Sequence, residues 1–126
     1  MVIKALFLLS VCLVLFTSCS FNKAVRGGEV VDHYDITQYS LPIQEVRYSN
    51  IDGTPLYAWF IRKDNYRQLP TIIFLHGSRG NIHDYIPMIE NLHRSLNVNI
   101  FAPDFPGTGA SKGEMSLENA YNRRQG

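Results

Sequence analysis

The sequence predicts an α/β fold in which strands alternate with helices. Residues 71–75 (TIIFL) are almost wholly apolar, as in a central strand that helices cover on both faces. Apolar residues then recur at spacings of three and four between Ile82 and Leu96, which is the period of an amphipathic helix. Residues 98–102 (VNIFA) are typical of another strand. Strand, helix and strand in this order predict a right-handed parallel crossover unit.

Two further strands precede this unit. Residues 44–49 (QEVRYS) alternate between polar and apolar side chains, as a half-buried strand does. A turn signal at 50–53 (NIDG) follows, and residues 56–62 (LYAWFIR) are rich in aromatic side chains. We therefore expect an antiparallel hairpin ahead of the parallel unit.

Proline and capping residues set the expected helix boundaries. Pro87 is tolerated in the first turn of a helix but clashes further along it, so we expect Asp84 to cap the first helix. A glycine-rich loop at 104–114 comes after the fourth strand. Ser116 is then expected to cap a second helix, whose apolar face opens with Leu117 and Ala120.

The first 18 residues are typical of an export signal. A short basic start is followed by the apolar run 5–16, which is too short to span a bilayer core of roughly 30 Å. The run ends in LFTSC at 15–19, which resembles a bacterial lipoprotein signal, although Phe16 stands where that pattern has Leu. The resemblance implies cleavage before Cys19 and acylation of its thiol; an ordinary cleaved signal is the alternative. Residues 19–40 are then expected to be a tether between membrane and domain.

Composition excludes several classes of function. Lys and Arg number 12 against 11 Asp and Glu, so nothing indicates a nucleic-acid partner. Both cysteines, Cys12 and Cys19, lie close to the amino terminus, so no disulfide framework is expected in the folded part. The four histidines have no metal-ligand spacing, and the glycine-rich loop lacks the ending of a phosphate-binding loop. We expect neither a metal nor a cofactor.

Two segments resemble the amino-terminal part of an α/β-hydrolase. Residues 72–81 (IIFLHGSRGN) are similar to the strand and HGxxGN turn of the esterase, depalmitoylase and serine-peptidase-like branches. Residues 99–111 (NIFAPDFPGTGAS) resemble the DxxGxGxS loop that follows the fourth strand in that family. The resemblance implies an incomplete α/β-hydrolase fold within residues 41–126, with the first four strands, one full helix and the start of a second.

The resemblance also implies a role for the turn at 76–81. Acyl transfer builds negative charge on a carbonyl oxygen, and backbone amides aimed at that oxygen stabilise it by a few kcal/mol. In the family one such donor is the amide that follows His-Gly, which is Ser78 here. The alternative is that the turn merely joins a strand to a helix. The residues expected to support the two loops are His76, Gly77, Gly80, Asn81, Asp104, Gly107 and Gly109.

Ser111 matches the nucleophile pattern G-x-S-x-G in GASKG at 109–113, but we interpret it as structural. A nucleophile elbow requires a strand immediately before the motif and a helix immediately after the serine, and neither is predicted there. The acid and histidine of the family follow the serine, yet residues 112–126 contain no histidine and no aspartate. The sequence therefore offers no nucleophile.

In the family, the nucleophile, acid and histidine all come after the fifth strand, which would place them beyond residue 126. We expect a truncated, lipid-anchored serine hydrolase of the bacterial cell envelope that is inactive as this chain. The intact family cleaves ester, thioester or peptide bonds. One alternative is half of a split hydrolase, whose carboxy-terminal half-domain partner pairs with the open edge at 71–75. The other is a non-enzymatic lipoprotein.

Overall fold

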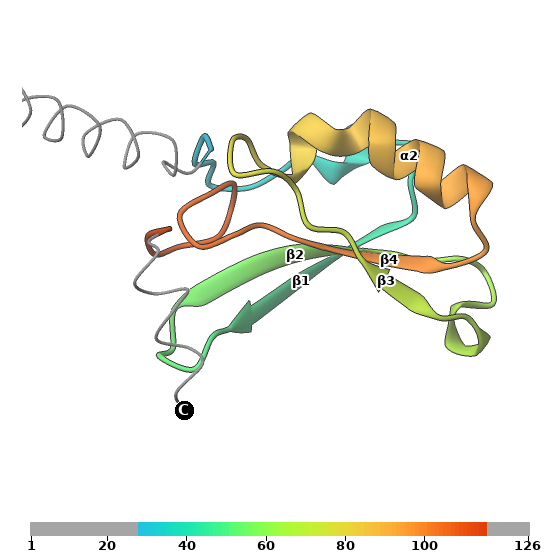
Figure 1. Cartoon of the computed structure of the whole chain (residues 1–126), viewed down its shortest axis with the longest axis horizontal. Helices are drawn as coiled ribbons and strands as arrows, with labels where there is room; N and C mark the ends of the chain where they lie inside the picture. The colour runs from blue at the N-terminus through green and yellow to red at the C-terminus, as the bar shows by residue number, and fades with distance from the viewer. Residues whose placement is uncertain (1–27, 116–126) are drawn as a thin grey trace, which may run out of the picture.

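Four strands form one mixed sheet in the computed structural model, which describes residues 28–115 (Figure 1). They are β1 (Ile43–Ser49), β2 (Pro55–Ile61), β3 (Thr71–Ile73) and β4 (Asn99–Pro103). Their order in the sheet is β1-β2-β4-β3. β2 pairs antiparallel with β1 and with β4, and β3 pairs parallel with β4. The predicted hairpin and the predicted parallel pair are both confirmed.

The helix that joins β3 to β4 is α2 (Ile86–Ser95), and it begins later than predicted. Pro87 lies in its first turn, as expected. Asp84, however, is not its cap, because a 3-10 turn, η3 (Ile82–Tyr85), comes first. Asn81 caps that turn by accepting a hydrogen bond from the His83 amide, and the Asp84 carboxylate accepts one from the Asn81 amide. Asp84 therefore takes part in the cap of this 3-10 turn and not in the cap of α2 that the spacing predicted.

The core lies between α2 and one face of the sheet (Figure 1). Alternate residues of β2 supply its largest side chains, and the register places Trp59 opposite Ala102 and Ile61 opposite Ile100 of β4. Two short 3-10 turns, η1 (Ile36–Gln38) and η2 (Tyr66–Gln68), lie outside the sheet. No helix among residues 28–115 is both long enough and apolar enough to cross a bilayer.

The segment before β1 is part of the folded domain. The Tyr34 ring is buried with its centroid 5.2 Å from that of Trp59, and the Tyr39 ring lies 5.4 Å from the same indole. Val31 donates a backbone hydrogen bond to Gly109. The expected tether therefore does not extend to residue 40, because these aromatic side chains bury apolar area on the core. The leader, Cys19 and the helix expected from Ser116 lie outside the described residues.

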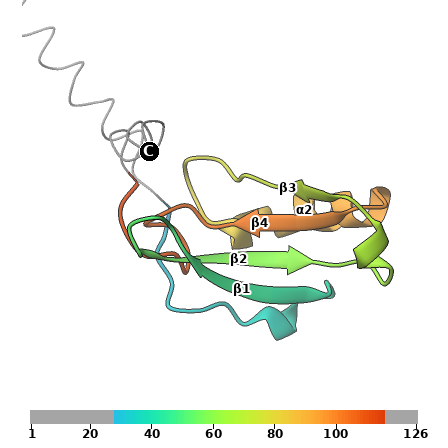
Figure 2. The same ribbon diagram turned by 90° about the horizontal axis from the view of Figure 1, so that it is seen from below.

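β3 is an edge strand and not the covered central strand that its composition predicted. It is hydrogen-bonded on one side only, to β4. Figure 2 shows the sheet from the face opposite α2, with β3 at its margin. Ile73 and Leu75 are 67% and 61% exposed, respectively. The expectation of an open apolar edge at 71–75 is therefore confirmed for the described part of the chain.

Candidate functional site

The two motif loops meet at the carboxyl ends of the parallel strands β3 and β4, at the left of Figure 1. The first loop follows β3 and contains His76. The second loop follows β4 and begins at Asp104 and Phe105. The His76 ring packs on that of Phe105, with 4.5 Å between the centroids. Ligands of α/β folds bind at this end of the strands, so the loops are where a site is expected.

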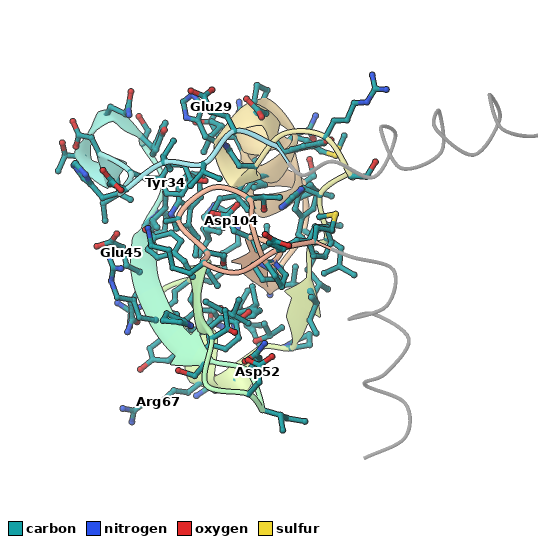
Figure 3. The ribbon with its side chains drawn as sticks, turned by 90° about the vertical axis from the view of Figure 1, so that its left-hand side faces the viewer. Glu29, Tyr34, Glu45, Asp52, Arg67 and Asp104 are labelled. Carbon is teal, nitrogen blue, oxygen red and sulfur yellow. The ribbon has the colours of Figure 1, made fainter. Side chains whose placement is uncertain are left out.

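Asp104 joins three segments of the chain through its buried carboxyl group, which is 1% exposed. Its Oδ2 atom accepts hydrogen bonds from the Tyr34 hydroxyl at 2.8 Å and the Ala110 amide at 3.0 Å. Its Oδ1 atom accepts one from the Ile82 amide at 2.9 Å. Figure 3 shows Tyr34 and Asp104 together near the centre of this end of the molecule.

Burial raises the pKa of Asp104 above the usual range, although its three hydrogen-bond donors oppose that shift. Burial and the neighbouring Asp104 carboxyl raise the pKa of the Tyr34 hydroxyl well above its usual value. Tyr34 therefore stays protonated and acts as the donor of this pair. The Asp104 carboxyl thus links the second motif loop to η3 and to the segment before β1, and its role in a functional site stays a prediction.

His76 is buried and fixed by its own loop. Its Nδ1 atom lies 2.7 Å from the Gly77 carbonyl oxygen. Because a carbonyl can only accept, Nδ1 carries the proton in this contact and Nε2 presents a lone pair. Nε2 accepts a hydrogen bond from the Phe105 amide at 3.5 Å and lies 3.7 Å from Asp104 Oδ1. His76 thus contacts both motif loops, and its role in supporting a functional site stays a prediction.

Hydrogen bonds hold the two successive peptide groups that flank Gly77. The Gly77 amide, in the His76–Gly77 peptide, donates to the Tyr85 hydroxyl at 3.2 Å. The Gly77 carbonyl, in the Gly77–Ser78 peptide, accepts from His76 Nδ1. In a planar trans peptide the carbonyl and the next amide point in opposite directions. The Ser78 N–H therefore points away from His76, on an exposed residue. No group within residues 28–115 accepts a hydrogen bond from it, so a ligand oxygen can.

The glycines of the loops serve two different needs. Positive φ angles, which residues with a side chain rarely adopt, occur at Gly80 (+89°), Gly107 (+74°) and Gly109 (+51°). Gly77 has no positive φ, but a Cβ atom there would lie 2.7 Å from the Tyr85 hydroxyl. A Cβ atom on Gly109 would lie 2.0 Å from Asp104 Oδ2. Lack of space for a side chain therefore explains why residue 77 is glycine. At Gly109 the same lack of space acts together with the positive φ angle.

Ser111 is fully buried and its hydroxyl is used twice. It accepts a hydrogen bond from the Tyr57 amide at 2.9 Å and donates one to the Asp104 carbonyl at 2.9 Å. It therefore ties the second loop to β2. This geometry agrees with a structural Ser111, because a nucleophile needs an accessible hydroxyl.

Sequence reasoning missed the contribution of the amino-terminal segment to this region. The Glu29 carbonyl accepts hydrogen bonds from Asn81 Nδ2 at 3.3 Å and from the Gly109 amide at 2.9 Å. Asn81 and Gly109 belong to different motif loops. The only signal in the sequence was the pair of tyrosines at 34 and 39, which are out of place in a polar tether. No cluster of His, Cys, Asp or Glu in residues 28–115 could hold a metal ion.

Curated proteins include relatives that are similar to much of the chain. The protein YfhR of Salmonella typhi is 31% identical over 122 residues, which cover 93% of this chain and 39% of that protein. The α/β-hydrolase domain-containing protein WAV2 of Arabidopsis thaliana is 33% identical over 87 residues, which cover 68% of this chain and 28% of that protein. The chain thus spans less than two fifths of the length of these relatives. No protein-family model matches it.

Solved structures include a similar esterase. The esterase Pf2001 of Pyrococcus furiosus superposes with a TM-score of 0.57 and 26% identity, over 76% of this chain and 36% of that one. The same esterase in a second space group gives a TM-score of 0.56 over 74% of this chain and 36% of that one. Within residues 28–115, the mixed sheet and helix α2 thus match part of an α/β-hydrolase fold. The chain belongs to the α/β-hydrolase superfamily, of whose fold it forms a part.

Proposed function

We propose that this chain forms the oxyanion-stabilising part of a serine hydrolase that cleaves ester, thioester or peptide bonds. The observation that carries the proposal is the Ser78 amide, which lies on an exposed residue and has no acceptor among residues 28–115, in a peptide whose Gly77 carbonyl is held by His76. The likeness to an esterase supports acyl transfer as the reaction. We further propose that Cys19 carries a lipid that attaches the protein to the bacterial cell envelope.

In the proposed reaction a nucleophile attacks the acyl carbon, and the carbonyl oxygen gains negative charge. The Ser78 N–H donates a hydrogen bond to that oxygen. His76 and Tyr85 keep the amide in position before the substrate arrives, so no free energy is lost in reorienting it. One such donor contributes about 3 kcal/mol to the stabilisation of the transition state.

The proposal assigns the nucleophile, acid and histidine to a part of the enzyme that follows the fifth strand, as in the family. Within residues 28–115 no serine is hydrogen-bonded to a histidine, and Ser111 is buried. The 126 residues alone are therefore proposed to be inactive, because the oxyanion donor cannot replace the attacking group.

The open edge of β3 favours a second form of the same proposal. In a split hydrolase, a separate carboxy-terminal half-domain would add its first strand beside Thr71–Ile73. That strand would pair with the free backbone groups of the edge and cover Ile73. In this arrangement the two chains would form one active site.

Reading the DNA that follows codon 126 provides the first test. A G-x-S-x-G motif followed by Asp and His, in the same or a neighbouring frame, supports the proposal. The chain is then expressed with and without that segment and assayed on p-nitrophenyl esters. We expect turnover only when both parts are present. Turnover by this chain alone that is lost in Ser111→Ala would contradict the assignment, and no turnover from the pair would favour a non-enzymatic lipoprotein.

The Ser78 amide is tested in the assembled enzyme by a matched pair of variants. Ser78→Pro removes the N–H group, whereas Ser78→Ala keeps it and removes only the hydroxyl. We expect Ser78→Pro to lower kcat by about 10²- to 10³-fold, as for other oxyanion donors. Ser78→Ala is expected to stay close to the unmodified enzyme. Equal losses in both variants would contradict a role for the backbone amide.

A further inference from the structure

The described chain enters the fold beside the candidate site. Gly28 lies so close to Gly80 that a Cβ atom on it would stand 1.8 Å from the Gly80 carbonyl oxygen. The next residue, Glu29, accepts hydrogen bonds from both motif loops through its carbonyl. Figure 3 looks onto this end of the molecule, with Glu29 above Tyr34 and Asp104. The first described residues are thus fixed against the two motif loops and not at the far end of the sheet.

The distance from this point to the proposed lipid anchor is short. Cys19 precedes Gly28 by nine residues. A fully extended chain of that length spans no more than about 30 Å, and a flexible one spans about 16 Å on average. A lipid on Cys19 would therefore keep the loop end of the domain close to the bilayer surface.

Three exposed apolar side chains lie at the same end of the molecule. Ile51, in the turn between β1 and β2, is 96% exposed, and Val30, which bridges to Gly109, is 57% exposed. Leu75 follows β3 and is also exposed. Pairing of Ala58 with Pro103 shows that the β1–β2 turn lies at the carboxyl end of β4, as Figure 2 also shows. An isolated exposed apolar residue is ordinary, but three at the end that carries the chain entry indicate a contact surface.

Charge at this end gives little reason to expect a specific protein or nucleic-acid partner. Exposed Arg79 and Lys112 are outnumbered by exposed acidic residues at this end, namely Glu29, Asp32, Asp52, Asp84 and Glu114. An acidic excess repels an anionic headgroup layer weakly. Contact with a bilayer would then depend on the apolar side chains and the anchor, and added salt should strengthen it slightly on anionic membranes.

We propose that the loop end of the sheet faces the bilayer, with Ile51 and Val30 in the headgroup layer. The substrates of the site are then esters or thioesters whose acyl chains are held in the membrane. The substrate class rests on the proposed acyl-transfer function and on acylation of Cys19. The orientation of the domain rests on the anchor and on the exposed residues alone.

Fluorescence quenching in vesicles tests the orientation. The full chain, acylated at Cys19, is given one new cysteine for labelling with nitrobenzoxadiazole, either by Arg79→Cys at the loop end or by Asn97→Cys at the opposite end. Both positions are exposed. Each protein is reconstituted in vesicles of phosphatidylcholine that contain a headgroup spin label. We expect at least about twofold stronger quenching at position 79. Equal quenching, or stronger quenching at position 97, would overturn the proposal.

A second pair of variants tests the apolar contact in the Arg79→Cys protein. Ile51→Asp is expected to reduce the quenching at position 79 by about half, because the charged side chain leaves the headgroup layer. Leu96→Asp changes an exposed apolar residue at the opposite end and should leave the quenching unchanged. Unchanged quenching in Ile51→Asp would overturn the contact.

The anchor is tested separately, by mass spectrometry of the amino-terminal peptide and by sedimentation of Cys19→Ser with vesicles. Loss of both the lipid and vesicle binding supports the proposal, and retention of binding without the lipid overturns it. None of these measurements depends on catalysis. A failed orientation is therefore distinguishable from a failed oxyanion role, which the Ser78 variants report.

Discussion

Replacing Tyr34 by Phe tests whether the amino-terminal segment stabilises the candidate site. The substitution removes the hydroxyl that donates to Asp104 at 2.8 Å. It keeps the ring, whose centroid lies 5.2 Å from that of Trp59 and 5.5 Å from that of Tyr57. The variant therefore isolates one buried hydrogen bond from the aromatic packing around it.

The expected loss is about 2 kcal/mol in the free energy of unfolding. A hydrogen bond to a charged group contributes roughly 1.5 to 3 kcal/mol, and the Asp104 carboxyl keeps only its two amide donors in the variant. Such a loss is large against the total stability of roughly 5 to 15 kcal/mol of a small domain. Loss of this donor should also raise the pKa of Asp104 further, because the Tyr34 hydroxyl favours the ionised form.

Trp59 fluorescence in urea at pH 7.5 measures the effect, because this tryptophan is the only one in the chain and is fully buried. With a slope of about 1 kcal/mol per molar urea, the midpoint should fall by about 2 M. Tyr66→Phe is the matched control, since the Tyr66 hydroxyl contacts only the exposed Arg67 side chain. A Tyr34→Phe protein within about 0.5 kcal/mol of the unmodified chain, like the control, would refute the reasoning.

Three further predictions concern the edge, the second loop and pH. Ile73→Lys places a charge on the open edge of β3 and should raise solubility, measured by light scattering at increasing concentration, whereas Met88→Lys on α2 should have little effect. Ser111→Ala should cost about 1 to 3 kcal/mol in urea unfolding by leaving the Tyr57 amide without its acceptor, yet leave kcat of an assembled enzyme unchanged. The Asp104 carboxyl should titrate above the usual aspartate range by carbon NMR, and exposed Asp35, whose pKa the Thr37 hydroxyl and amide lower, should titrate below it. Because the folded state raises the pKa of Asp104, its contribution to stability is greatest below about pH 4 and falls as the pH rises through the folded value. Reversed order of the two titrations would contradict the assigned environments.

The strands were predictable because their side-chain period reflects which face is buried. The hairpin at 44–49 and 56–62 appears within one residue as β1 and β2. The helix start was less predictable. Pro87 correctly limited α2, but the reciprocal hydrogen bonds between Asn81 and Asp84 add a 3-10 turn that periodicity does not reveal.

Composition alone could not place β3 in the sheet. A five-residue apolar run shows that a strand can be buried, but not which neighbours bury it. In the described part of the chain β3 has one neighbouring strand, so Ile73 remains exposed. The resemblance to the hydrolase family gave the correct expectation of an open edge, because strand order is a property of the whole fold.

The tether was misplaced for a different reason. Tyr34 and Asp104 are 70 residues apart in the sequence, and their hydrogen bond forms only when the whole sheet is assembled. Residues 28–40 are rich in polar side chains, so this stretch taken by itself resembles a linker. The burial of Tyr34 is decided instead by the aromatic surface of β2, which no local pattern contains.

The same long-range contacts determine how far the two motifs depend on the segment before them. Each motif supplies its own glycines and caps, but the Glu29 carbonyl accepts hydrogen bonds from both motif loops. Tyr34 also donates to the Asp104 carboxyl, which in turn accepts a hydrogen bond from the Ile82 amide. A displacement of residues 28–34 would release contacts on both loops at once. Because the proposed anchor at Cys19 lies just upstream of this segment, attachment to a membrane and the geometry around Ser78 involve the same stretch of chain.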